Sequence, residues 1–339
     1  MSALGSAPIP ATPLPGVSYV MPVLNEVTHI RAAVESLLEQ DYAGPMEVTL
    51  ALGPSTDGTN ELVAQMCVED TRIHSVDNPA AATPVGMNLA IKASSYPIVI
   101  RVDAHSVLPK DYASIAVETL LRTQADNVGG IMDAQGTTPF ERAVARAYDT
   151  KVGLGGTPFH VGGKEGPVDT VYLGVFNRES LLKVGMFNEE IRRGQDWELN
   201  RRIRDAGGLV WFTPKLKVVY RPRTSVKALV KQMYSTGLWR GELSRRFGSG
   251  LRYFVPPMMV VATALGILAG VLGFTLGWVI PAVYVAFVLV STAVYGRGMG
   301  VKGLWWFPLV LPCIHFAWGV GFIMSYTRLT SNIAGKSGR

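Results

Sequence analysis

A carboxylate and an imidazole stand two residues apart at the end of an apolar run. The run PIVIRVDAHSVLP covers residues 97–109 and contains Asp103 and His105. In an extended strand, residues i and i+2 point to the same side, so these two side chains can converge on one ion. A carboxylate with an imidazole suits Mn²⁺ or Zn²⁺, and suits Mg²⁺ less well because Mg²⁺ prefers oxygen ligands. The alternative is that Asp103 caps the next turn and His105 is an ordinary surface residue.

A second pair of carboxylates lies at the start of a predicted helix. The stretch GQDWELNRRIRDAGG covers residues 194–208, and Asp196 and Glu198 fall in its first turn. The helix dipole stabilises carboxylates there. A carboxylate in this position can act as a general base. The simpler interpretation is the usual acidic bias of helix N-termini.

Two further stretches have side chains that can hold phosphate or sugar groups. In GPSTDGT, residues 53–59, the Ser, Thr and Asp side chains can bind ribose or phosphate, although a tight connecting turn explains them nearly as well. In QMYSTGLWR, residues 232–240, Gln232, Trp239 and Arg240 can form an amphipathic clamp. The alternative for this second stretch is an interfacial helix with a Trp anchor.

These residues fall within a pattern of alternating strands and helices. Helical periodicity separates the predicted strands, which are VSYVMP (17–22), EVTLAL (47–52), IHSVD (73–77) and PIVIRVD (97–103). Such alternation predicts a parallel sheet that is covered by helices on both faces. Ligands of such sheets bind beyond the carboxyl ends of the strands, which is where Asp103 is expected.

Two long stretches near the C-terminus contain no Asp, Glu, Lys or Arg. They cover residues 253–296 and 303–327. Because about 20 apolar residues cross a bilayer, the first stretch is long enough for two crossings. The sequence therefore predicts a membrane region over 253–327, with helices near 254–274, 276–295 and 304–326.

The path of the third apolar segment has two interpretations. Three crossings, which we expect, place the basic tail over 328–339 outside, although basic residues favour the inside. Alternatively, the third segment is re-entrant or interfacial, because Pro308 and Pro312 can break it and His315 is costly at mid-bilayer.

Charge and composition place the rest of the chain relative to the membrane. The 339 residues carry a net charge of +6. Basic residues crowd between 227 and 252, which favours the cytoplasmic leaflet and explains the charge without nucleic acid. We expect amphipathic interfacial helices over 225–252 and a flexible leader over 1–16. The two cysteines lie in different regions, so a reducing compartment is expected.

The order of these motifs resembles that of inverting family-2 glycosyltransferases with the GT-A fold. The chain is most similar to bacterial succinoglycan-type exopolysaccharide glucosyltransferases. The similar stretches are YVMPVLNE, STDGT, NPAAATPVGMNLAI, RVDAHS, TVYLGVFNRESLLKVGMFNEEI, QDWELNRRIRDAGG and QMYSTGLWR. The resemblance implies an α/β, Rossmann-like domain over 17–224, with a mostly parallel sheet and helices on both faces, followed by a helical membrane region.

The resemblance also implies roles for individual residues. It makes Asp103 and His105 the ligands of a divalent cation, Mn²⁺ or Mg²⁺, and Asp196 the catalytic base, with Glu198 in support. The implied nucleotide-sugar-binding residues are Pro22, Asn25, Glu26, Ser55, Asp57, Asn88 and Arg101. The implied acceptor or diphosphate residues are Gln195, Gln232, Trp239 and Arg240.

The chain departs from the family pattern at two positions. Leu52 stands where the family usually has an Asp that binds the base, so the donor nucleotide stays open. Gln195 and Asp196 replace the usual Glu–Asp pair, which keeps the base and removes one charge.

The implied reaction moves a sugar, with inversion, from a nucleotide-diphosphate sugar to a lipid-linked saccharide in polysaccharide or glycolipid biosynthesis. The implied location is the cell (inner or plasma) membrane, as a multi-pass protein with a cytoplasmic catalytic domain. No nucleic-acid partner is expected. One alternative is a polyprenyl-monophosphate sugar synthase, and another is a catalytically inactive glycosyltransferase-like membrane scaffold.

Overall fold

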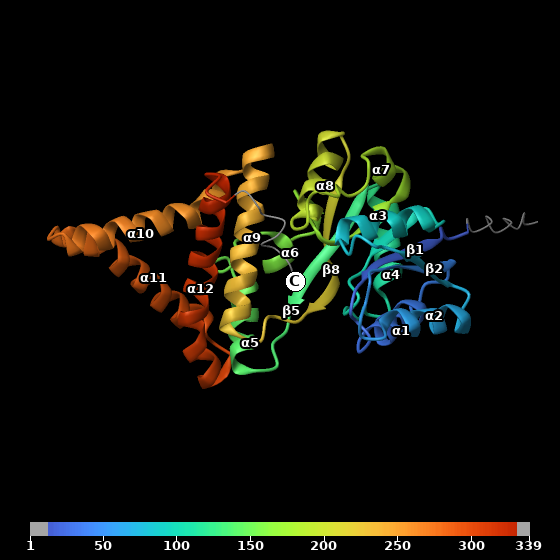
Figure 1. The fold of residues 1–339 in the computed structure, drawn as a ribbon, viewed down its shortest axis with the longest axis horizontal. Helices are drawn as coiled ribbons and strands as arrows, with labels where there is room; N and C mark the ends of the chain where they lie inside the picture. Colours follow the sequence, from blue (N-terminus) through green and yellow to red (C-terminus); the bar gives the residue numbers. More distant parts are fainter. Residues whose placement is uncertain (1–12, 331–339) are drawn as a thin grey trace, which may run out of the picture.

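A sheet domain and a C-terminal group of helices make up the chain in the computed structural model, which describes residues 13–330 (Figure 1). Of the predicted leader over 1–16, only residues 13–16 are described. Of the predicted tail over 328–339, only residues 328–330 are described.

One sheet of eight strands organises the part of the chain before helix α9 (Val226–Phe247). Its order is β3-β2-β1-β4-β7-β5-β8-β6, and four of its seven strand pairings are parallel. The strands are β1 (Val17–Val23), β2 (Met46–Leu52), β3 (Ile73–Asp77), β4 (Ile98–Arg101), β5 (Asn127–Ala134), β6 (Gly166–Pro167), β7 (Tyr172–Asn177) and β8 (Val210–Tyr220). The antiparallel strand β7 lies between β4 and β5, and it joins the parallel first half to the mixed second half.

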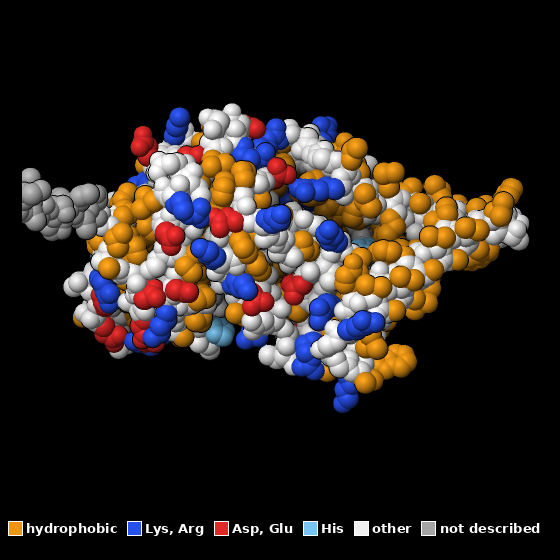
Figure 2. Space-filling model, turned by 180° about the vertical axis from the view of Figure 1, so that it is seen from behind, with side chains coloured by type: hydrophobic (Ala, Val, Ile, Leu, Met, Phe, Trp, Pro, Cys, Tyr) orange, Lys and Arg blue, Asp and Glu red, His pale blue; other side chains and the backbone are white. Residues whose placement is uncertain are grey.

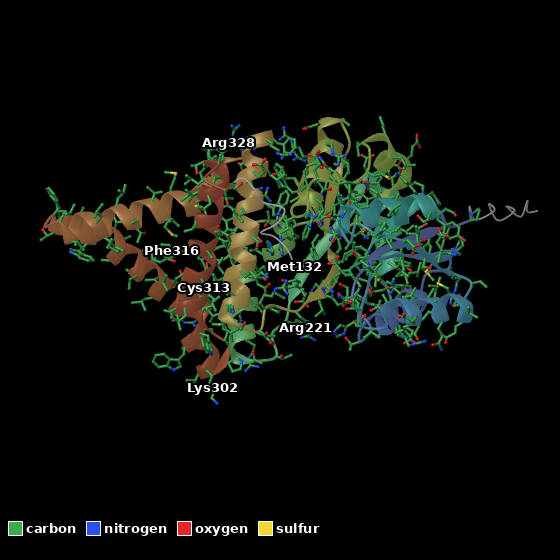
Figure 3. The ribbon with its side chains drawn as sticks, viewed as in Figure 1. Met132, Arg221, Lys302, Cys313, Phe316 and Arg328 are labelled. Atoms are coloured by element: carbon green, nitrogen blue, oxygen red, sulfur yellow. The ribbon has the colours of Figure 1, made fainter. Side chains whose placement is uncertain are left out.

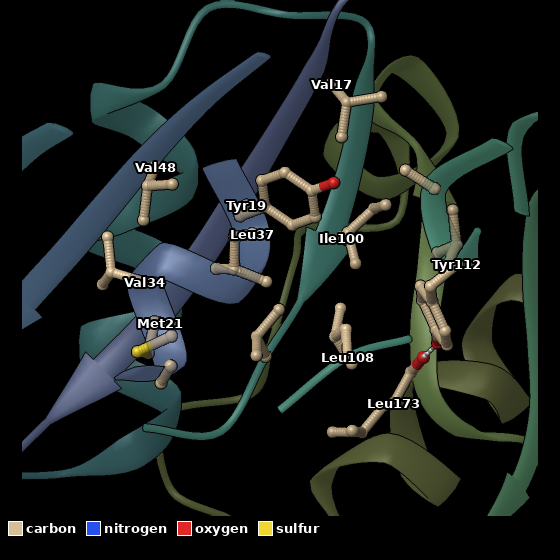
Figure 4. Packing of buried hydrophobic residues seen from close by; sticks show 14 of the residues in the cluster. Val17, Tyr19, Met21, Val34, Leu37, Val48, Ile100, Leu108, Tyr112 and Leu173 are labelled. Carbon is tan, nitrogen blue, oxygen red and sulfur yellow. Dashed lines mark hydrogen bonds between the residues drawn. The ribbon is translucent and has the colours of Figure 1, made fainter. Parts of the chain in front are cut away.

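Helices cover both faces of this sheet. They are α1 (Ile30–Leu38), α2 (Thr59–Glu69), α3 (Thr83–Ala93), α4 (Tyr112–Thr123), α5 (Pro139–Tyr148), α6 (Pro158–Val161), α7 (Arg178–Lys183) and α8 (Gln195–Asp205). Alternate residues of β1 face opposite cores, as strand geometry requires. Tyr19 and Met21 pack with α1, α2 and α4 (Figure 4), whereas Val20 packs with α3, α7 and α8. The predicted fold class is therefore confirmed.

The C-terminal region contains four long helices. They are α9 (Val226–Phe247), α10 (Val255–Val271), α11 (Val279–Tyr295) and α12 (Gly300–Tyr326), with the short helical turns η1 (Leu251–Phe254) and η2 (Thr275–Trp278). The segments Leu251–Val271, Thr275–Tyr295 and Gly300–Tyr326 are long and apolar enough to cross a membrane. The hairpin of α10 and α11 projects from the body (Figure 1), and hydrophobic side chains are spread along the face of it that Figure 2 shows.

Helix α9 runs beside α12 with their backbones in close approach. A Cβ on Gly237 would lie 2.0 Å from the carbonyl oxygen of Trp318, and a Cβ on Gly321 would lie 2.2 Å from that of Tyr234. Only glycine tolerates such proximity. The region predicted as amphipathic helices over 225–252 is thus one long helix, followed by η1, and one face of α9 is buried against α12.

Candidate active site

Arg101 is the last residue of β4, and its guanidinium joins two carboxylates. The side chain is 8% exposed, and its Nη2 donates a hydrogen bond to Oδ1 of Asp103 at 3.2 Å. Its Nη1 donates to Oδ1 of Asp196. Burial alone lowers the pKa of Arg101, but the charges of Asp196 and Asp103 outweigh it and hold that pKa above its ordinary value. One cation therefore connects the end of a central strand to the start of α8.

The two carboxylates at the start of α8 have different surroundings. Glu198 is 4% exposed, and its Oε1 and Oε2 accept hydrogen bonds from Arg202 at 2.7 and 2.8 Å. Asp196 is 29% exposed and uses only Oδ1 for Arg101, so Oδ2 is left for a substrate group. Gln195, beside it, is 8% exposed. Of the two acids, Asp196 is the one with an open oxygen.

Asp103 and His105 lie in a turn, which corrects the expectation of an extended strand through residue 103. Strand β4 ends at Arg101, and the backbone N–H of Ser106 donates to the carbonyl oxygen of Asp103 at 2.9 Å. Its pairing with β1 also ends there, with Arg101 opposite Val20. Any convergence of the two side chains must therefore come from the turn and not from strand alternation.

The side chains at this turn carry the kinds of donor atoms that a divalent cation takes. The side chain of Asp103 is 26% exposed and that of His105 is 55% exposed, so both can reach an ion at the surface. Nδ1 of His105 lies 3.5 Å from Oε1 of Glu26. No cluster of three or more His, Cys, Asp or Glu side chains suited to a metal occurs between residues 13 and 330. Two protein ligands leave coordination positions for the oxygens of a diphosphate or for water.

The loops after β1 and β2 are tied together by several predicted nucleotide-binding residues. The backbone N–H of Asn25 donates to Oγ of Ser55 at 3.0 Å, and that of Glu26 donates to Oγ1 of Thr59 at 2.9 Å. Both carboxylate oxygens of Asp57 accept bonds from these loops, and the bond from Thr59 is the main cause of a lowered pKa for Asp57. Asn25, Glu26, Ser55 and Asp57 therefore lie together, and their polar groups bind one another's loops and hold the two loops in place.

Two other predicted nucleotide-binding residues are buried. Pro22 lies in β1 opposite Ala51 of β2. Asn88 of α3 donates from Nδ2 to the carbonyl oxygen of Phe187 at 2.8 Å and to Oε1 of Glu189 at 2.9 Å, and its Oδ1 accepts from the N–H of Phe187. Asn88 therefore fixes the loop before α8.

The end of β2 lacks a polar side chain but has one beside it. Leu52 is 9% exposed and belongs to the main core. Its partner in the β2–β3 register is Asp77, which is exposed. A carboxylate is therefore present at this edge of the sheet, one strand away from the expected position.

The predicted acceptor residues on α9 divide into two groups. Gln232 donates to the hydroxyl of Tyr220 at 2.9 Å and accepts from Nε of Arg223 at 3.1 Å. Trp239 is 5% exposed and packs against α8. Arg240 stacks between the rings of Trp197 and Tyr253, at 4.7 and 4.4 Å from their centroids. Trp239 and Arg240 therefore dock α9 onto the helix that carries Asp196, whereas Gln232 lies in a separate polar cluster.

One residue of this site was missed from the sequence. Tyr172, at the start of β7, has a pKa well above its usual value because of burial, and the charges of Asp103 and Asp196 add to this effect. Its only sequence signal is its place in an apolar run, TVYLGVF, which also suits a core residue. Its proximity to the carboxylates depends on the antiparallel insertion of β7 beside β4.

Comparisons with known proteins agree with this architecture. Residues 18–185 match the family described as Glycosyl transferase family 2. The chain is 31% identical over 312 residues to the succinoglycan biosynthesis protein ExoA of Rhizobium meliloti (strain 1021), covering 89% of this chain and 92% of that protein. It is 24% identical to a dolichyl N-acetyl-alpha-D-glucosaminyl phosphate 3-beta-D-2,3-diacetamido-2,3-dideoxy-beta-D-glucuronosyltransferase of Methanococcus voltae, covering 81% of this chain and 86% of that one.

A solved structure shares the fold across nearly the whole chain. It is the mannosyltransferase PcManGT from Pyrobaculum calidifontis in complex with GDP-Man and Mn²⁺, with a TM-score of 0.59 and 20% identity. The alignment covers 95% of this chain and 90% of that one. The membrane-side helices are therefore included in the likeness.

Proposed function

The chain belongs to glycosyltransferase family 2, and from this premise we propose that it moves a sugar, with inversion, from a nucleotide-diphosphate sugar to a lipid-linked saccharide. The observation that carries the proposal is the bridge from Asp103 through Arg101 to Asp196. It joins a carboxylate on the donor side to a carboxylate on the acceptor side. The name of the relative from Methanococcus voltae, which includes a dolichyl-linked sugar phosphate, supports an acceptor of this kind.

In this mechanism the chain's own residues orient the acceptor and take up its proton. Asp196, held through Oδ1 by Arg101, accepts the proton of the acceptor hydroxyl at its open Oδ2. Asp103 and His105 would hold Mn²⁺ or Mg²⁺, which neutralises charge on the leaving nucleoside diphosphate. The loops that carry Asn25, Glu26, Ser55 and Asp57 border the nucleoside, and Asp77 is a further candidate for the base contact in place of Leu52.

The function can be tested with the purified full-length protein and a panel of UDP- and GDP-sugars. We expect one donor to release its nucleoside diphosphate in Mn²⁺ or Mg²⁺, and a lipid-linked saccharide to accelerate that release. Turnover with bare polyprenyl phosphate alone would instead identify a polyprenyl-monophosphate sugar synthase. No release from any donor would favour the inactive membrane scaffold.

His105→Ala is expected to weaken metal-dependent binding of the nucleoside diphosphate. Loss of a direct ligand should lower the affinity at least as much as loss of a residue that hydrogen-bonds to a metal ligand, which typically lowers it roughly 10–100-fold. His105→Asp should restore binding because a carboxylate also coordinates these ions. Calorimetry with UDP and GDP, with and without Mn²⁺, measures the effect.

The matched control for this substitution is His29→Ala. His29 is an exposed histidine that precedes α1, and its side chain makes no capping hydrogen bond. If His29→Ala and His105→Ala give equal affinities in the presence of Mn²⁺, then His105 is not a metal ligand.

The proposed membrane arrangement has α10 and α11 as a crossing hairpin, with α9 and α12 along the cytoplasmic surface. In the apolar window of α12, 44% of the residues are buried, against 17% for α10 and 11% for α11. Phe307, Val310 and Ile314 of α12 share a core with α5 of the catalytic domain. If α12 crossed the bilayer, the charged residues of α5 and α9 would have to enter it, which is costly. The packing thus favours the interfacial alternative over three crossings.

This arrangement predicts the side on which the C-terminus lies. Once Cys67 and Cys313 are replaced, a cysteine introduced as Ser337→Cys should react with an impermeant thiol reagent only after permeabilisation. Leu276→Cys, in the exposed turn between α10 and α11, should react on intact cells in either arrangement. Labelling of Ser337→Cys on intact cells would establish three crossings. Ser337 itself lies outside the described residues.

A further inference from the structure

A cavity of about 450 Å³ lies beside α8, at the end of α9 where the membrane hairpin begins. Trp197, Arg201 and Arg204 line it from α8, and Arg252 and Tyr253 line it from η1. Along α8 these positions are spaced four and three residues apart, which places them on one helix face. This cavity, the arginine pocket, contains none of the residues that form the bridge from Asp103 to Asp196.

The ion pairs in the arginine pocket are weak and leave a positive charge. Arg204 and Arg252 share one carboxylate, Asp169, at 3.6 and 3.4 Å, and Arg201 lies 3.2 Å from Asp205. Asp169 is 59% exposed and Asp205 is 62% exposed, and exposed pairs of this kind contribute little stability. Three guanidinium groups thus face two carboxylates that a stronger anion can displace.

Two guanidinium nitrogens have no partner among the described residues, one on the lining residue Arg204 and one on Arg240, which does not line the pocket but lies between two of its rings. Nε of Arg204 and Nη1 of Arg240 are buried without a hydrogen bond to any residue that the structure describes. Arg240 is held between the pocket rings of Trp197 and Tyr253. Buried donors without acceptors are costly, and a bound anion or water would supply the acceptors that these two nitrogens lack. Planar guanidinium groups match phosphate oxygens in geometry and charge.

The position of the arginine pocket relates it to both the membrane and the proposed base. Arg252 and Tyr253 immediately precede α10, the first helix of the apolar hairpin. At 1.5 Å per residue, Arg201 and Arg204 lie about 8 and about 12 Å from Asp196 along the axis of α8, and Asp196 lies off the helix face that lines the pocket. A group bound in the pocket is thus separated from the base by a distance that a short saccharide can occupy. A second cavity, of about 230 Å³, shares Asp169 and Arg252 and extends this space.

We propose that the arginine pocket binds the diphosphate of the lipid-linked acceptor, so that the lipid tail leaves along α10 and the saccharide extends to Asp196. This inference rests on the proposed function and adds to it an acceptor site with a diphosphate. A free phosphate or an anionic phospholipid headgroup shares part of this chemistry, but a diphosphate carries more oxygens and more negative charge for the three guanidinium groups that line the pocket.

The test measures binding of farnesyl diphosphate to the purified full-length protein in detergent, with EDTA present to prevent binding at the cation site. Farnesyl monophosphate and vesicles of phosphatidylcholine with phosphatidylglycerol serve as the comparison ligands. The variants are Arg204→Gln and Arg252→Gln. The matched control is Lys302→Gln, which removes one positive charge near the start of α12 (Figure 3), and Lys302 is not one of the residues that line the pocket.

The wild type should bind the diphosphate more tightly than the monophosphate, and each pocket substitution should weaken diphosphate binding about 10-fold or more. Lys302→Gln should bind like the wild type. Undiminished diphosphate binding by both pocket variants would overturn the proposal. The proposal would also be overturned if the pocket substitutions weakened binding to phosphatidylglycerol vesicles equally and the wild type showed no preference for the diphosphate. That result would mark a general site for anionic lipids.

A parallel measurement separates this proposal from the proposed function. Binding of UDP and GDP in Mn²⁺ reports the donor site and the folding of each variant, and it should be unchanged in all of them. If the wild type binds neither nucleotide, the proposed function fails, whereas the diphosphate measurement in EDTA still decides the arginine pocket.

Discussion

Asp196→Asn is expected to lower sugar transfer by about 10²–10⁴-fold and to leave nucleotide binding near that of the wild type. The substitution is nearly isosteric, and the amide oxygen can still accept the hydrogen bond from Arg101. It removes the carboxylate that would accept the proton of the attacking hydroxyl. Initial rates of nucleoside diphosphate release, measured with saturating acceptor, give the loss, and calorimetry with the nucleotide gives the affinity.

Glu198→Gln distinguishes the base from its neighbour on α8. Glu198 is buried and both of its oxygens bind Arg202, so this substitution should lower thermal stability more than it lowers the turnover of folded protein. Turnover near that of the wild type in Asp196→Asn, with a large loss in Glu198→Gln, would move the role of base to Glu198.

Arg101→Gln is expected to lower both stability and transfer. Breaking a buried ion pair from one side costs about 3–5 kcal/mol. Asp103 and Asp196 are 26% and 29% exposed, so water can replace part of the lost interaction. We therefore expect a loss near 3 kcal/mol, or a fall of about 6–12 °C in the melting temperature of the catalytic domain. Transfer should fall about 100-fold in the folded fraction, because Asp196 loses the group that positions it.

The control for Arg101→Gln is Arg31→Gln. The side chains of Arg31 and Glu69 are 40% and 44% exposed, so the loss of this pair should change the melting temperature little. The double variant Arg101→Gln, Asp196→Asn should be less impaired than two independent losses predict, because the two residues interact directly. Full additivity would show that the bridge does not couple the two residues.

The sequence was sufficient to predict the fold and the edge of the sheet where the site lies. Apolar runs and helical periodicity placed β1 to β4 correctly to within two residues, and they placed Asp103 at the carboxyl end of the fourth strand. They could not predict that β4 ends at Arg101 or that the following residues form a turn. That boundary coincides with the end of the pairing with β1, which is a tertiary property.

The contacts of individual site residues could be predicted only in part. Arg101, Asp103 and Asp196 were identified by type, but their bridge joins residues almost one hundred positions apart. Asn88 carries a side chain suited to a nucleotide, yet its amide is used for the backbone before α8. The arginine pocket combines Asp169, α8 and η1, and no local spacing in the sequence relates these segments. The proposed path of α12 along the membrane surface rests on its contacts with α9 and α5, whereas its composition alone predicts a crossing helix.

The stereochemistry of the product tests the central claim most directly. Nuclear magnetic resonance of the lipid-linked product, made with the donor that the screen identifies, gives the anomeric configuration of the new glycosidic bond. A single displacement assisted by Asp196 predicts a configuration opposite to that of the sugar in the donor. A product with the donor's configuration retained would contradict the role of Asp196 as a base and the mechanism built on it.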